Sequence, residues 1–195
     1  MKKLGFDLVL LGAPASGKDT QARLLQNHFA FKPVESGEWF RRMMKTNSAL
    51  ARLIKKTVGQ AKPAPVSLMK AFLTQELKKA PKNKDLLFVG NPKLKPEAQF
   101  LVKNLKSQRR DFLAIYIKLP PAEIFKRSFF RKRHDDLKKV LIDRRIAWHT
   151  KQVGKTVKYF AKLDKLKVIN GNQSILKVSV DIHKAINDYT RSQRN

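Results

Sequence analysis

Residues 12–21 carry the strongest chemical signal in the chain, with the sequence Gly-Ala-Pro-Ala-Ser-Gly-Lys-Asp-Thr-Gln. An apolar run at 6–11 precedes this segment, and a helix-compatible stretch at 20–29 follows it. A strand, a glycine-bounded loop, a lysine and a helix in this order are typical of a phosphate-binding loop. Gly12 and Gly17 let the backbone turn and direct its N–H groups inward, and a helix beginning near Lys18 adds its positive dipole end. Lys18 can then reach the β- and γ-phosphates of a nucleotide.

Two other interpretations of this N-terminal segment are weaker. Two lysines and an apolar run could begin a secretory signal peptide, but Gly5 and Asp7 interrupt the run and leave it too short. A chance glycine turn would require several independent features to coincide. The loop itself departs from the common pattern at one position. Asp19 stands where a Mg²⁺-binding hydroxyl usually follows the lysine, and Thr20 comes one place later.

The composition indicates a single domain without a membrane span. A chain of 195 residues with 42% hydrophobic residues can bury one core. No apolar stretch approaches the ~20 residues that a transmembrane helix needs. The absence of cysteine excludes disulfides and cysteine-ligated zinc, and it fits a reducing compartment. We expect a cytoplasmic protein that acts as a monomer.

The charge is unusually positive. Lysine and arginine number 43 against 15 acids, which gives a formal net charge of +28. Residues 121–170 contain fifteen basic side chains and five acids. A polyanionic partner such as RNA would explain this excess, but so would a solvated, lysine-rich surface. Scattered lysine pairs, at 55–56, 78–79 and 138–139, favour the solvated surface, so a nucleic-acid partner is not favoured.

Apolar runs alternate with helical segments along the chain. Strands are predicted at 6–11, 32–35, 86–89, 112–117 and 166–169. The runs are mostly apolar on both faces, which predicts a doubly wound α/β domain around a parallel five-stranded sheet, with ligands at the carboxyl ends of the strands. The segment between Glu35 and Leu86 is too long for one crossover and contains Pro63-Ala64-Pro65, so it indicates an inserted helical subdomain.

The residues also resemble a known family, the adenylate kinases. Residues 12–21 resemble the first motif of that family, Gly-x-Pro-Gly-x-Gly-Lys-Gly-Thr-Gln. Four more segments resemble later motifs in the family order, at 35–41, 90–93, 133–136 and 167–171. The likeness covers nearly the whole chain. It implies a P-loop kinase domain over 1–195, with a helical insert at 36–66 that binds the monophosphate and a short lid at 128–136 without a zinc-binding insert.

The resemblance implies a Mg²⁺-dependent transfer of phosphate from ATP to AMP, which yields two ADP. One alternative is a kinase for another monophosphate, GMP or a pyrimidine nucleotide. A second alternative is a kinase-derived RNA- or ribosome-binding protein with little turnover. Because a phosphate oxygen is already a good nucleophile, no general base is expected. The histidines at 28, 134, 149 and 183 are therefore not expected to be catalytic.

The resemblance also assigns site residues. ATP would be bound by Gly12, Ala13, Pro14, Ala15, Ser16, Gly17, Lys18, Asp19, Thr20, Arg127, Arg131, Asn170 and Gly171. The monophosphate would be bound by Ser36, Gly37, Arg41, Val58, Ala64, Gly90, Lys93, Glu97, Arg133 and Arg145. Catalysis would fall to Lys18, Arg127, Arg133 and Arg145. Counting from Tyr159 favours Arg145 for the last position, whereas counting from Asp136 favours Arg144.

Three positions depart from the family pattern. Val89 replaces an aspartate that supports Mg²⁺, and Asp19 replaces a glycine. We expect that this carboxylate has moved across the site, so that Asp19 holds the metal; the competing interpretation is that Asp19 caps the helix or pairs with Lys18. Glu97 replaces the glutamine that contacts the acceptor base. Either Glu97 contacts the base, or it points to solvent and pairs with a nearby lysine.

Overall fold

A computed structural model of the protein describes residues 1–58, 64–130 and 139–193, with side chains from residue 146 onward in the last of these ranges. Its centre is a parallel sheet in the order β2-β3-β1-β4-β5. The strands are β1 (Asp7–Gly12), β2 (Phe31–Val34), β3 (Asp85–Val89), β4 (Phe112–Lys118) and β5 (Leu166–Asn170). All five predicted strands are confirmed, with ends that shift by at most one residue.

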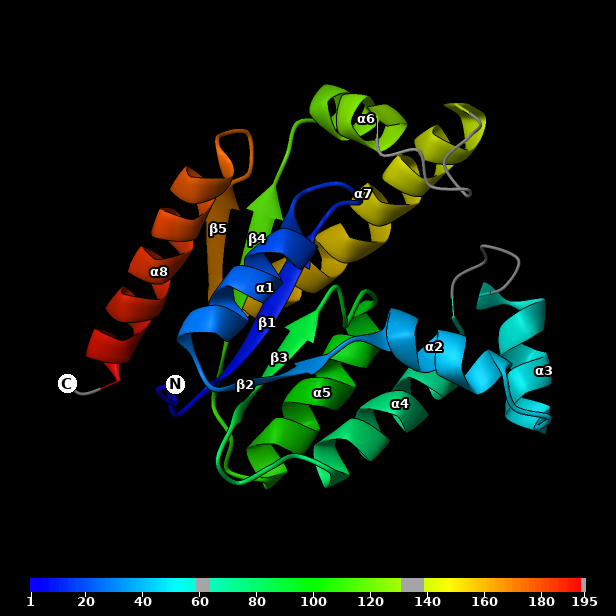
Figure 1. Ribbon diagram of the computed structural model, residues 1–195, viewed down its shortest axis with the longest axis horizontal. Coiled ribbons are helices and arrows are strands. Elements are labelled where there is room, and N and C mark those ends of the chain that lie inside the picture. The colour runs from blue at the N-terminus through cyan, green and yellow to red at the C-terminus, as the bar shows by residue number, and fades with distance from the viewer. Residues whose placement is uncertain (59–63, 131–138, 194–195) are drawn as a thin grey trace.

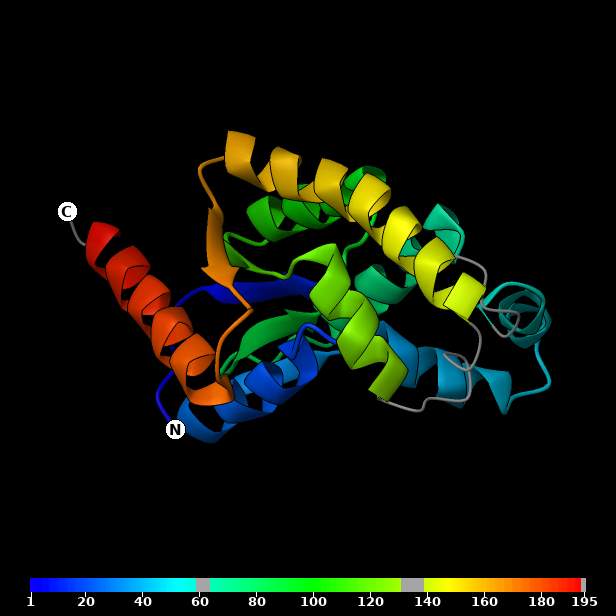
Figure 2. The same cartoon turned by 90° about the horizontal axis from the view of Figure 1, so that it is seen from above.

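Helices cover both faces of the sheet (Figure 1, Figure 2). On one face lie α1 (Lys18–His28) and α8 (Ile175–Ser192), packed on Leu8 and Leu10 of β1. On the other lie α4 (Val66–Lys78), α5 (Lys95–Ser107) and α7 (Lys139–Lys162), packed on Val9 and Leu11. Every residue of β1 is buried, as expected for a strand with helices on both sides. The predicted doubly wound α/β fold is confirmed.

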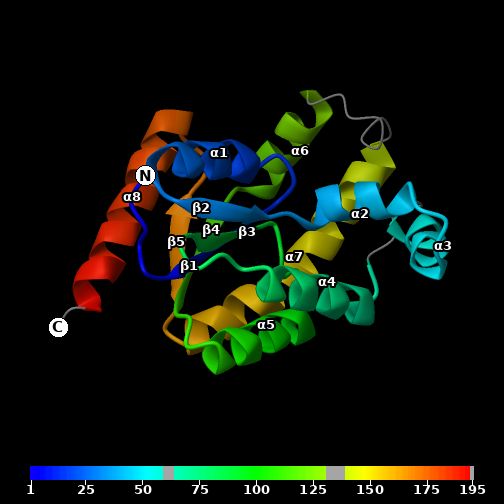
Figure 3. The ribbon, with the colours of Figure 1, turned by 60° about the horizontal axis from the view of Figure 1, so that its bottom comes forward.

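The remaining helices lie near the carboxyl ends of the strands. They are α2 (Ser36–Met44), α3 (Ala49–Lys56) and α6 (Pro121–Phe130). Figure 3 shows α2 and α3 projecting beyond the sheet from the end of β2. Trp39 anchors α2 to the core, because its indole Nε1 donates to Gln75 Oε1 of α4 at 3.0 Å.

The two predicted subdomains are only partly within the described chain. The insert at 36–66 contains α2 and α3, but residues 59–63 lie outside the described ranges. The lid at 128–136 is described only up to residue 130. Both divisions stay predictions. No helix in the described part of the chain is long and apolar enough to cross a membrane.

Candidate functional site

The segment between β1 and α1 forms a tight loop. Gly17 caps the start of α1 at φ 85°, and Ala15 also adopts a left-handed conformation, at φ 59°. A side chain at Gly12 would bring its Cβ within 2.3 Å of Ser16 Oγ, so the loop closes only over glycine there. Ser16 Oγ is buried, and no described residue gives it a hydrogen bond. A buried hydroxyl in this position fits a loop that encloses a phosphate group.

Lys18 connects this loop to the end of β3. A Cβ added at Gly90, the residue after β3, would come within 2.9 Å of Lys18 Cε. The absence of a side chain at Gly90, which has φ 65°, therefore leaves room for the lysine stem. The Lys18 ammonium lies 3.2 Å from Asp19 Oδ1. Asp19 thus pairs with Lys18, as one of the two interpretations expected.

The loop after β3 is fixed by two buried polar side chains. Asn91 Nδ2 donates to Val34 O at 2.9 Å and to Val89 O at 3.1 Å, which joins the ends of β2 and β3. Glu97 Oε2 accepts hydrogen bonds from the N–H groups of Lys93 at 2.8 Å and Leu94 at 3.1 Å. These contacts shape the turn in which the predicted acceptor-binding residues lie.

Glu97 is only 2% exposed, so the alternative in which it points to solvent is wrong. Burial raises the pKa of its carboxyl group, and the two N–H donors partly oppose that rise. Oε2 is engaged by the turn before α5, which leaves Oε1 as the oxygen that could face an acceptor base. Glu97 therefore has a structural role that the sequence comparison did not assign to it.

Asp19 is the carboxylate at the position where the metal was expected, and the described residues contain no cluster of three or more metal-binding side chains. Val89 is buried at the end of β3 and offers no ligand. Burial raises the pKa of Glu35, and the negative charges of Asp19 and Glu38 raise it further. The charges of Asp19 and Glu38 therefore act on Glu35. Glu35, which follows β2, was not among the predicted metal ligands.

The predicted donor side is assembled from α6 and β5. Arg127 Nε donates to Glu123 Oε1 at 2.6 Å, and its NH1 donates to Gly171 O at 3.3 Å. Gly171 has no room for a side chain, because a Cβ would lie 2.7 Å from Ile117 Cγ2. Asn170 Oδ1 accepts from the Asn172 N–H and closes the same turn. Two assigned ATP-binding segments, far apart in sequence, are thus in contact.

His149 on α7 was not predicted to belong to the site, yet it contacts the phosphate-loop backbone. Its Nε2 lies 3.1 Å from Gly12 O, and the residue is 8% exposed. Burial, together with the nearby cations Lys18 and Lys93, lowers the pKa of His149 to about 4, against the opposing effect of the hydrogen bond to Gly12 O. The imidazole is therefore neutral at physiological pH, and Nε2–H donates to the carbonyl oxygen. About two helical turns further on, Thr156 Oγ1 donates to Lys93 O at 2.8 Å.

The other assigned residues fall into two groups. Arg41 is exposed on α2 with its NH1 over Gly37, Ser36 is buried, and Val58 and Ala64 pack partly buried against the core. Arg131 and Arg133 lie outside the described residues, as do the side chains of Arg144 and Arg145. The choice between Arg144 and Arg145 therefore stays open.

Comparison with known proteins agrees with this geometry. A family model described as adenylate kinase matches residues 10–165. An adenylate kinase of Azobacteroides pseudotrichonymphae is 27% identical over 192 residues, which cover 95% of this chain and 100% of that protein. Adenylate kinases of Prochlorococcus marinus and Bacteroides fragilis are 27% and 26% identical, over 90% and 93% of this chain and 95% and 98% of their own lengths. The chain belongs to the adenylate kinase family and is a phosphotransferase of the nucleoside monophosphate kinase type.

Proposed function

We propose that the protein transfers the γ-phosphoryl group of Mg·ATP to AMP and releases two ADP. The observation that carries this proposal is the position of Lys18. Its stem crosses from the phosphate loop to Gly90, so one cation borders both the expected donor loop and the expected acceptor loop. The proposed cytoplasmic location and monomeric state rest on the family alone.

The reaction requires cations more than it requires acid–base chemistry. Two polyanionic nucleotides must approach, and the transition state spreads negative charge over the equatorial oxygens of the transferred group. Lys18 would bind the donor phosphates, and Arg41 and Lys93 would bind the acceptor phosphate. Arg127, now held by Glu123 and Gly171, would face the donor side together with Arg131. Arg133 and Arg145 complete the proposed set.

The residues present fit a magnesium ion. Mg²⁺ is usually bound through one or two carboxylates together with substrate phosphates. Asp19 and Glu35 supply two acids whose charges interact beside Lys18. We propose that Asp19 is the principal ligand and that Glu35 assists it. When bound, the ion would neutralise phosphate charge in the transition state.

The direct test is an assay of the purified protein with Mg·ATP and each nucleoside monophosphate, with product nucleotides resolved. We expect AMP to be the best acceptor. Lys18→Ala should lower turnover by roughly 10²-fold or more, because the variant loses the ammonium group that binds phosphate. The fold should stay intact, because Lys18 is not part of the hydrophobic core. Near-normal turnover in Lys18→Ala would contradict the assignment of residues 12–21.

The same assay examines the acceptor base. A carboxylate offers only hydrogen-bond acceptors, so Glu97 could accept from the adenine amino group and would also suit guanine N1–H and N2–H₂. The wild type should therefore accept GMP better than Glu97→Gln does. The variant is a matched control, because the amide oxygen of Gln can still accept the hydrogen bonds that shape the turn. Identical acceptor preferences in the two proteins would show that Glu97 only shapes the turn.

A further inference from the structure

Lysines collect on the solvent side of α5 and α7. Four lie on α7 at helical spacing and three lie on α5, and all seven are exposed: Lys95, Lys103, Lys106, Lys151, Lys155, Lys158 and Lys162. We call this set the α5–α7 lysine face. The α7 row spans eleven residues, which corresponds to roughly 16 Å along the helix axis. The two helices pack side by side, joined where Thr156 of α7 bonds to the carbonyl group that precedes α5 (Figure 2, Figure 3).

This face carries almost no compensating negative charge. Residues 146–162 of α7 contain no acid, and the only acid of α5 is the buried Glu97. None of the seven lysines forms an ion pair with a carboxylate in the described part of the chain. A row of cations without acids is costly through mutual repulsion unless solvent or a polyanion screens it.

The opposite face of the sheet is different. On α1 and α8, basic side chains alternate with three aspartates, Asp19, Asp181 and Asp188. Lys177 Nζ, for example, lies 3.0 Å from Asp181 Oδ1. The excess positive charge of the chain is therefore not uniform over the two helical layers. A lysine-rich solvated surface alone would not require this segregation.

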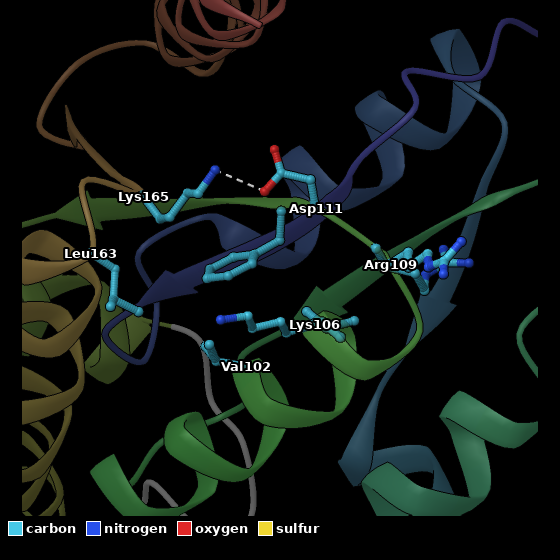
Figure 4. A pocket seen from close by; sticks show the side chains of 9 residues that line it. Val102, Lys106, Arg109, Asp111, Leu163 and Lys165 are labelled. Carbon is cyan, nitrogen blue, oxygen red and sulfur yellow. Dashed lines mark hydrogen bonds and ion pairs between the residues drawn. The ribbon is translucent and has the colours of Figure 1, made fainter.

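A cavity of about 380 Å³ lies at the end of the lysine face, between the last turn of α5, the start of β4 and the residue after α7. Its apolar walls come from Val102, Leu105, Phe112 and Leu163. Figure 4 shows Lys106 extending along the cavity, Lys165 turned toward Asp111, and Arg109 pointing away. An apolar hollow at the end of a cationic track is the arrangement that single-stranded nucleic acids use, with the backbone on cations and a base on an apolar surface.

We propose that the α5–α7 lysine face binds single-stranded nucleic acid, with phosphates along the two lysine rows and an unstacked base in the cavity. An anionic membrane fits less well, because membrane-surface helices pair cations with an exposed apolar face. Of the large apolar side chains exposed in the described residues, only Leu163 lies at this face. The proposed surface is separate from the residues assigned to phosphoryl transfer.

Two charge-matched variants test the proposal. The first carries Lys151→Glu, Lys155→Glu, Lys158→Glu and Lys162→Glu on the lysine face. The second carries Arg23→Glu, Lys177→Glu, Lys184→Glu and Arg191→Glu on the opposite face. Both change the net charge equally. Circular dichroism and the phosphotransfer assay establish that each variant is folded, and we expect both to keep wild-type turnover.

Binding is measured with a fluorescently labelled, mixed-sequence single-stranded RNA at salt concentrations between about 0.05 and 0.2 M. The wild type and the opposite-face variant should bind within about twofold of each other, whereas the lysine-face variant should bind at least 10-fold more weakly at about 0.15 M salt. The slope of log binding constant against log salt concentration should be smaller in magnitude by about 3 for this variant. Four lysines are replaced, and each phosphate contact on a single strand contributes ~0.7 to the slope.

Three results would overturn the proposal. One is an equal loss of RNA affinity in both variants, which would mean that net charge alone matters. Another is wild-type binding that has disappeared at about 0.15 M salt. The third is binding to phosphatidylserine vesicles that only the lysine-face variant loses, with RNA affinity unchanged. A duplex of the same sequence should compete less well than the single strand, and equal competition would contradict the role of the cavity.

Discussion

His149 is buried against the carbonyl oxygen of Gly12, where the phosphate loop begins. Two cations, Lys18 and Lys93, act on the same imidazole and disfavour its protonation. The hydrogen bond to Gly12 O alone would favour a protonated ring, but burial and the two cations outweigh it and keep the ring neutral. This makes His149 a positioning residue whose protonation would place a third positive charge in a region that burial already keeps from water.

The first prediction concerns pH and stability. The pKa of His149 is lowered to about 4 in the folded protein. Between pH 6.5 and 4, His149 is therefore mostly protonated in the unfolded chain but mostly neutral in the folded protein. Stability is unaffected above this window and falls as the pH drops through it. His149→Gln keeps a donor for Gly12 O but does not titrate. Between pH 7 and pH 5, the wild type should lose about 2 kcal/mol more of its unfolding free energy than His149→Gln does.

Urea unfolding at the two pH values measures this difference. Because the same carboxylates titrate in both proteins, their contribution cancels in the comparison. Equal losses in the wild type and in His149→Gln would mean that the imidazole is accessible to protons in the folded protein.

The second prediction concerns the displaced carboxylate. Asp19 stands in the loop beside Lys18, and Val89 stands buried at the end of β3. If Asp19 holds the metal, Asp19→Gly should raise the Mg²⁺ concentration needed for half-maximal turnover, because a ligand is lost. Adding Val89→Asp should restore much of that loss. A faster or unchanged Asp19→Gly enzyme would show instead that Asp19 serves only as the ion-pair partner of Lys18.

At the scale of elements, the central strands β1, β3 and β4 were predictable because each is mostly apolar and buried by both helical layers, whereas the edge strands β2 and β5 carry exposed positions. The turn before α5 could also have been predicted, since Pro96 followed by Glu97 at the third helical position is a capping pattern. The contact of His149 with Gly12 could not, because it joins residues 137 positions apart in the chain. Such contacts depend on how α7 packs across the sheet, and no local pattern encodes that.

The third prediction concerns α7, which contacts both phosphate-binding segments. His149 bonds to Gly12 and, further along the helix, Thr156 bonds to Lys93 O. Thr156 is fully buried, so Thr156→Val removes the donor with little change in shape. We expect KM for the acceptor to rise about 3- to 10-fold while KM for ATP stays unchanged, since a lost hydrogen bond of about 1 kcal/mol loosens only the acceptor loop. Steady-state kinetics with each substrate varied in turn measures both values, and parallel changes in the two would contradict a local effect.

At the scale of the whole molecule, the carboxyl ends and the amino ends of the parallel strands have different roles. The carboxyl ends of the strands carry the candidate site. The amino ends carry a buried ion pair, in which Arg110 Nε donates to Asp7 Oδ2 at 2.7 Å. Asp7 is fully buried at the start of β1, and its Oδ1 also accepts from the Leu86 N–H of β3 at 2.7 Å. The sequence did not indicate this pair, nor the segregation of lysines on one layer, because both arise only when distant segments pack together.

The last prediction tests this division between the two ends of the strands. Arg110→Leu would leave the Asp7 carboxylate buried without its cation, which should lower the unfolding free energy by about 3 kcal/mol or more. Asp7→Asn combined with Arg110→Leu removes the unpaired charge while the Asn oxygen can still accept from Leu86, so the double variant should be more stable than Arg110→Leu alone. Urea denaturation measures both values. Because the pair lies at the amino ends of the strands and the phosphate loop lies at the carboxyl ends, both variants should keep wild-type turnover at temperatures where they are folded. A double variant as unstable as Arg110→Leu would show that the guanidinium contributes through packing rather than through its charge.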